Sequence, residues 1–133
     1  RQGIGNNAVN ITRINSSGEI IWNKTFGGGD GIQGSNALQN TMDDNFILTY
    51  NTYNHIKDGY DTWLVKINDS GFIEWGRKFS NDGGDLGFSC LQTLDGGYVV
   101  TGSTFNLGYG NKDFGDLWLL KTDEKGIIAL PQN

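Results

Sequence analysis

The chain has 133 residues, a formal net charge of −5, 21 glycines and a single cysteine. This length suits one domain with a modest core, and one cysteine excludes an intramolecular disulfide. The sequence has neither the basic stripe that a nucleic-acid partner needs nor an apolar run long enough to insert into a membrane. Glycine, asparagine and aspartate, which favour turns, outnumber alanine and glutamate, which favour helices. The composition therefore predicts an all-β protein with many tight turns.

The first predicted element is a hairpin over residues 10–26, and its pattern returns at residues 63–79 and 118–128. Each copy has a glycine in its turn. The three turn glycines stand 53 and 55 residues apart and are Gly18, Gly71 and Gly126. The tryptophans also recur at matching positions, Trp22 with Trp75 and Trp63 with Trp118. A fixed period of this length is the sequence signature of a repeat architecture.

Each full repeat divides into four short strands separated by turn residues. The predicted strands cover residues 36–40, 46–52, 62–67 and 72–79 in the first full repeat, and 89–93, 98–104, 117–122 and 127–130 in the second. Within one of them, Trp63, Val65 and Ile67 share a face and Lys66 lies on the other, which is typical of a strand. The strands at 46–52 and 98–104 are apolar on both faces in places. We expect such strands inside a sheet that is covered on both sides.

Four antiparallel strands in about 40–55 residues is the size of a β-propeller blade. One such sheet cannot bury both of its faces and needs a stacked neighbour on each side. The sequence therefore predicts antiparallel four-stranded blades, with a half blade over residues 1–26 and blades over residues 27–79 and 80–133. About two and a half blades make a partial propeller, because a closed ring usually has four or more. The favoured interpretation is a piece of a longer chain, and the alternative is a ring of several chains.

The clearest copy of the repeat reads DTWLVKINDSGFIEWGRKF at residues 61–79 and LQTLDGGYVVTGST at residues 91–104. It resembles a class of β-propeller repeats that occur widely in large secreted or surface proteins of archaea and bacteria. Residues 116–128 restart the pattern, and residues 9–52 match it more loosely, with Asn10 in place of the strand tryptophan. The resemblance implies a surface-exposed or secreted scaffold or adhesion module.

The expected function is structural: a non-catalytic interaction module of an extracellular or cell-surface protein, with other protein blades or subunits as partners. One alternative is a lectin-like propeller that binds glycans. The other is a propeller enzyme of the quinoprotein or glycosidase type, because the hairpin at residues 68–75 resembles the turn-and-tryptophan hairpin of quinoprotein propellers. That hairpin is one residue shorter here, and no quinone- or calcium-binding set accompanies it.

The recurring tryptophans and turn glycines are interpreted as structural residues. Fixed repeat positions suit packing between blades, and the alternative for the tryptophans is an aromatic platform for a sugar. Cys90 is interpreted as a small buried hydrophobe. His55 lies in a polar loop and is interpreted as a solvated side chain.

Acidic, glycine-rich loops precede several predicted strands. Calcium prefers hard oxygen ligands, and the aspartates that could supply them are Asp82, Asp85, Asp113 and Asp116. No spacing matches an EF-hand loop, and turn chemistry alone accounts for aspartate and glycine here. We therefore expect no cofactor and no metal, with calcium at these four residues as the alternative. The same residues are pairs only in sequence, so a glycosidase mechanism has no support from them.

Four N-x-S/T sequons occur, at Asn10, Asn15, Asn23 and Asn68. Asn15 and Asn68 fall at equivalent predicted turns, which we expect to be exposed. They are therefore the glycosylation candidates if the chain passes through a glycosylating secretory route.

Overall fold

The computed structural model describes residues 8–27, 31–56, 58–80, 84–105 and 115–128. Every regular element in these residues is a β-strand, which confirms the all-β prediction. The strands are β1 (Ala8–Ile14), β2 (Ile20–Gly27), β3 (Ile32–Asn40), β4 (Phe46–Asn54), β5 (Gly59–Ile67), β6 (Ile73–Phe79), β7 (Asp85–Gln92), β8 (Tyr98–Thr104) and β9 (Asp116–Thr122). Within this part of the chain, no helix is long and apolar enough to cross a membrane.

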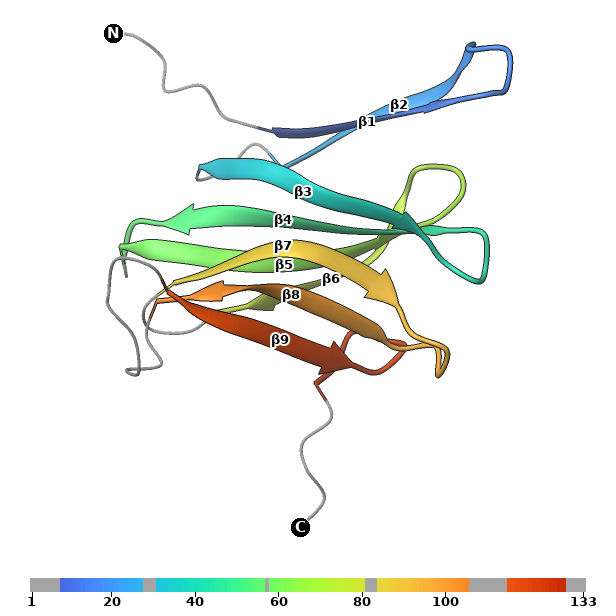
Figure 1. The fold of residues 1–133 in the computed structure, drawn as a ribbon. Helices are drawn as coiled ribbons and strands as arrows, with labels where there is room; N and C mark the ends of the chain where they lie inside the picture. Colours follow the sequence, from blue (N-terminus) through green and yellow to red (C-terminus); the bar gives the residue numbers. More distant parts are fainter. Residues whose placement is uncertain (1–7, 28–30, 57, 81–83, 106–114, 129–133) are drawn as a thin grey trace, which may run out of the picture.

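The strands form three antiparallel sheets that follow one another along the chain (Figure 1). The first sheet pairs β1 with β2, the second has the order β3-β4-β5-β6, and the third has the order β7-β8-β9. In Figure 1 the second sheet lies between the other two. The fourth strand predicted for the last repeat is present as a single bridge between Thr122 and Ile128, and residues 129 and 130 lie outside the described residues.

The recurring turns have the same geometry in all three sheets. Asn15, Asn68 and Asp123 each accept hydrogen bonds at Oδ1 from the backbone N–H groups two and four residues further on. The turn then needs a residue in the left-handed region, and the φ angles of Gly18, Gly71 and Gly126 are +83°, +83° and +74°. Glycine adopts such angles without steric cost, so the repeated glycine follows from the turn itself.

The first strand of each full repeat is longer than the sequence predicts. β3 and β7 begin four residues before the predicted starts at 36 and 89. Their early residues, IQGS in β3 and DLGF in β7, contain Gly34 and Gly87, and they pair with β4 and β8 through irregular registers. The glycine and the irregular register interrupt the periodic side-chain pattern that marks a strand in the sequence.

The hydrophobic core has two parts, one on each face of the second sheet. The first cluster contains Val9, Ile32, Leu48, Val65 and Ile67, and the second contains Ile47, Leu64, Cys90, Tyr98 and Val100. Consecutive residues of β4 enter different clusters, because successive side chains of a strand point to opposite faces. This confirms the expectation that the strand predicted at 46–52 is covered on both sides.

Candidate functional site

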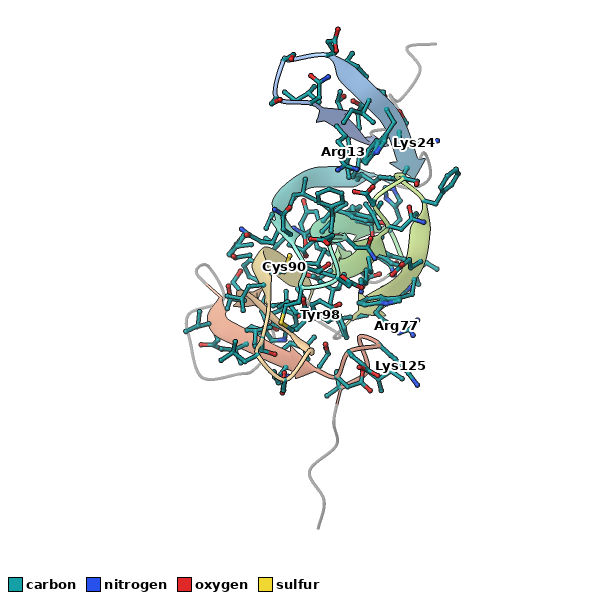
Figure 2. All side chains as sticks on the ribbon, turned by 90° about the vertical axis from the view of Figure 1, so that its right-hand side faces the viewer. Arg13, Lys24, Arg77, Cys90, Tyr98 and Lys125 are labelled. Carbon is teal, nitrogen blue, oxygen red and sulfur yellow. The ribbon has the colours of Figure 1, made fainter. Side chains whose placement is uncertain are left out.

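The sheets contact one another through the same structural element at both junctions. The indole of Trp22, on β2, lies against the turn at Gly71 of the second sheet. A Cβ added to Gly71 would come within 3.0 Å of that ring. One repeat later, Trp75 on β6 lies against the turn at Gly126 in the same way, with 2.7 Å to an added Cβ. Figure 2 shows Arg13 and Lys24 at the first junction, and Arg77 and Lys125 at the second.

The aromatic contacts at the junctions also repeat. Trp22 meets Phe46 edge-on, with ring centroids 6.4 Å apart, and Trp75 meets Tyr98 edge-on at 5.5 Å. Phe46 and Tyr98 both open the second strand of their sheet. Edge-to-face pairs of this kind stabilise packing beyond the area they bury. The other two recurring tryptophans pack against the clusters, Trp63 against the first and Trp118 against the second.

A buried polar link joins the second sheet to the third. Asn51 Nδ2 donates to the carbonyl oxygen of Gly87 at 3.1 Å, and Asn51 Oδ1 accepts from the N–H of Gly87 at 2.9 Å. Thr62 Oγ1 lies 2.8 Å from the same nitrogen and 3.2 Å from the carbonyl oxygen of Asp85. These side chains hold β7 at its irregular start, where a Cβ on Gly87 would meet Thr62 at 2.5 Å.

The outer face of the third sheet exposes large apolar side chains of the described residues. The exposed fractions of Leu117 and Leu119 are 86% and 66%, although both lie within β9. Leu119 occupies the position that Leu64 has in the second sheet. Leu64 pairs with Thr49 and Leu119 pairs with Thr101, and each threonine is the fourth residue of its strand. Leu64 is fully buried. The third sheet therefore exposes the face that the second sheet buries against its neighbour.

The outer face of the first sheet carries a network of polar side chains, next to the exposed Ile14, Ile20 and Ile21 at its turn end. Asn10 donates to Asn23 Oδ1 at 2.8 Å and to Thr25 Oγ1 at 3.0 Å, and Asn23 Nδ2 lies 2.8 Å from Thr12 Oγ1. All four side chains are exposed. Asn10 pairs with Thr25 in the first sheet, and Trp63 pairs with Lys78 at the equivalent place in the second. Asn10 therefore takes the position of the recurring tryptophan, and this replacement lies on the outer face. The third sheet has no such polar network on its outer face among the described residues, where Leu117 and Leu119 lie instead.

The turns between the first and second strands of the full repeats carry ion pairs. Lys66 donates to Asp43, and Lys121 lies 2.9 Å from Asp95. Burial alone would raise the pKa of Asp43, but hydrogen bonds from Lys66 and Thr41 and the charge of Lys66 lower this pKa to about 2. Hydrogen bonds from Thr93 and Lys121 likewise hold the pKa of Asp95 well below its usual range.

The structure places two of the four calcium candidates. Asp85 is fully buried and Asp116 half-buried, and both pair in register with Thr104 from opposite sides. Asp82 and Asp113 lie outside the described residues. Among the residues that are described, no three His, Cys, Asp or Glu side chains gather as a metal site would require.

The structure also places the glycosylation candidates Asn15 and Asn68, the cysteine and the histidine. The glycosylation candidates Asn15 and Asn68 use Oδ1 to hold their turns, and Asn15 Nδ2 also donates to Glu19 at 2.8 Å. Cys90 lies in the second cluster, where burial raises the pKa of its thiol to about 12. His55 is exposed in the turn after β4, with its ring edge against Tyr53.

A pocket of about 360 Å³ opens on the second sheet beside the end of β2. The residues that line it include Tyr50, Thr52, Asn54, His55, Asp61, Trp63 and Lys78. Sequence reasoning did not single out Tyr50 or Lys78. Tyr50, Trp63 and Lys78 lie side by side on one face of the sheet. This arrangement marks Tyr50 and Lys78 as pocket residues, but it depends on the register of β4, β5 and β6, which the sequence does not give.

No family model matches the chain, and no curated protein matches it in sequence.

Proposed function

We propose that the chain is a non-catalytic interaction module built from β-propeller-type blades, with a half blade at residues 1–26 followed by blades at 27–79 and 80–133. The outer face of the third sheet takes a further sheet of the same repeat, including one from a second copy of the chain. The observation that carries this proposal is the exposure of Leu117 and Leu119 at positions that are buried one repeat earlier.

Three features support a stacking role. The junctions use one repeated contact, a tryptophan on a turn glycine, so the chain already joins sheets in a fixed way. Large apolar side chains on a sheet face are costly to leave in water, and clustered exposed ones mark interaction surfaces. The resemblance of residues 61–104 to repeats of secreted and surface proteins supports an extracellular or cell-surface location.

Association of the 133-residue chain tests the proposal. We expect sedimentation equilibrium to show concentration-dependent self-association, because the uncovered face of one copy is the apolar surface that a second copy can cover. Leu119→Lys places a charge on this face and should leave the chain monomeric.

Ile20→Lys is the matched control. Ile20 and Leu119 both have an exposed fraction of 66%, and Ile20 has exposed apolar neighbours in Ile14 and Ile21, but it lies on the first sheet, away from the outer face of the third. We expect this variant to associate like the parent chain. A parent chain that stays monomeric at every concentration, or equal effects of both lysines, would contradict the proposal.

A further inference from the structure

The pocket on the second sheet has a floor made of two neighbouring rows of side chains on one face of the sheet. One row runs Tyr50, Trp63, Lys78 across β4, β5 and β6, and the next pairs Thr52 with Asp61. The turn after β4 adds His55 and the fully exposed Ile56 at the side. The volume of about 360 Å³ lies within the range of small-molecule sites.

The residues at the first junction, where this pocket lies, differ from those at the second. Between the second and third sheets, Asn51 and Thr62 reach across to Gly87, and Gly102 stands where the second sheet has Tyr50. In the first sheet, Val9 is the residue equivalent to Thr62. Val9 pairs with Phe26, and Thr62 pairs with the corresponding phenylalanine, Phe79. Val9 enters the hydrophobic cluster and offers no polar group to the second sheet.

The aromatic rings in the floor are parallel. Tyr50 and Trp63 have ring centroids 6.1 Å apart and an interplanar angle of 7°. Trp63 Nε1 donates to Thr52 Oγ1 at 3.1 Å, which holds the edge of the indole beside Thr52. Aromatic faces of this kind pack against the C–H faces of flat, partly apolar ligands.

The polar groups beside the rings are fixed and nearly balanced in charge. Lys78 Nζ lies 3.8 Å from Asp61 Oδ2, and Asn54 Nδ2 donates to the same oxygen at 3.3 Å. The side chain of Asp61 is 4% exposed and that of Lys78 is 47% exposed. The carboxylate therefore anchors the amide and the ammonium, while the ammonium keeps donors available to a ligand.

We propose that this pocket binds an uncharged saccharide. A sugar presents a C–H face to Tyr50 and Trp63 and hydroxyl groups to Lys78, Asn54 and Thr52. Because the Asp61 and Lys78 charges offset one another, the pocket offers no net attraction to a charged ligand. The proposal does not depend on association through the third sheet, so either can fail alone.

Fluorescence titration of the intact chain with three neutral oligosaccharides, cellotriose, maltotriose and mannotriose, tests the site. We expect at least one of them to change the tryptophan emission in a saturable way. Trp63→Phe keeps an aromatic ring in the pocket but removes the tryptophan that reports binding, so this variant should abolish the emission change. Trp118→Phe, at the equivalent position of the third sheet, should retain it.

Lysine variants test the polar contact. Lys78→Met should weaken binding at least about tenfold, as expected for loss of one charged hydrogen bond. Lys121→Met is the control, because Lys121 is 41% exposed and also pairs with an aspartate, Asp95, far from the pocket floor in the register of the sheets. If Lys78→Met does not fold, as judged by circular dichroism, Lys78→Gln replaces it. Absence of saturable binding of all three sugars, or equal effects of the two lysine variants, would overturn the proposal.

Discussion

Lys66 is the most enclosed charged side chain at the turn end of the second sheet, and it carries the ion pair with Asp43. Its side chain is 10% exposed, while that of Asp43 is 50% exposed. Glu74 Oε2 lies 3.7 Å from the same ammonium. Burial alone would lower the pKa of Lys66, but the hydrogen bond and charge of Asp43, together with Tyr98, raise it. The ammonium is thus held in its charged form by its neighbours.

The lowered pKa of Asp43 predicts an acid-dependent loss of stability. An aspartate in the unfolded chain has a pKa near its ordinary value of 3.8, whereas the pKa of Asp43 in the folded chain is about 2, so folding favours the charged form. The contribution is present above pH 3.8 and is lost as the pH falls through 2. We expect Lys66→Met to return the Asp43 pKa toward 3.8, as measured by carboxyl ¹³C NMR. A parent pKa already near 3.8 would show that the pair is not formed in solution.

The recurring hairpin turn is the element that joins each sheet to the one before it. Gly18 and Gly71 have the same φ of +83°, but their surroundings differ. A Cβ at Gly18 would meet nothing within 4 Å, whereas one at Gly71 would meet Lys24 at 2.8 Å and Trp22 at 3.0 Å. The pair therefore separates the conformational need for glycine from its role in packing.

Alanine at these two glycines should destabilise the chain to different degrees. Gly18→Ala incurs only the strain of a left-handed alanine, about 1–2 kcal/mol. Gly71→Ala adds overpacking against the Trp22 ring, roughly 1–3 kcal/mol more. Urea unfolding of both variants measures the difference. Equal losses would mean that Trp22 moves aside freely and that the tryptophan-on-glycine contact does not hold the junction.

At the level of elements, turns were easier to predict than strand starts. A turn such as Asn68 to Gly71 depends on residues that are close in sequence, so its three copies are recognisable in the sequence alone. In sequence, ALQ at residues 37–39 aligns with CLQ at residues 90–92, so Leu38 matches Leu91. In the sheets, Leu38 pairs with Leu48 and Cys90 pairs with Val100, so Leu38 is equivalent to Cys90, one residue earlier. β3 absorbs its extra residue through two register irregularities, where β7 has one. Hydrophobic periodicity cannot locate a bulge that only the partner strand defines.

At the level of the whole molecule, the repeat predicted that sheets must stack, but not how the two ends differ. The polar network on the first sheet combines Asn10 and Asn23, which are 13 residues apart and meet only through the register of β1 and β2. The pocket likewise combines residues from three strands. Long-range pairing decides both features, and a single sequence does not display it.

Cohesion between the second and third sheets should depend on the buried link at Asn51. Asn51→Ala removes the bonds to both backbone groups of Gly87 and the one from Thr62 Oγ1, at roughly 1 kcal/mol each. We expect a loss of about 2–4 kcal/mol in the free energy of unfolding. Faster amide exchange should accompany it, concentrated in β7.

Ser103→Ala is the control for this change. Ser103 pairs with Leu117 as Asn51 pairs with Thr62, so it occupies the same repeat position on the uncovered face of the third sheet. With no sheet of the described residues stacked beyond it, the variant should lose less than about 0.5 kcal/mol. If Ser103→Ala and Asn51→Ala were equally destabilising, the side chain of Asn51 would matter within its own sheet rather than between sheets. The stack would then be held by its apolar clusters and tryptophan contacts alone.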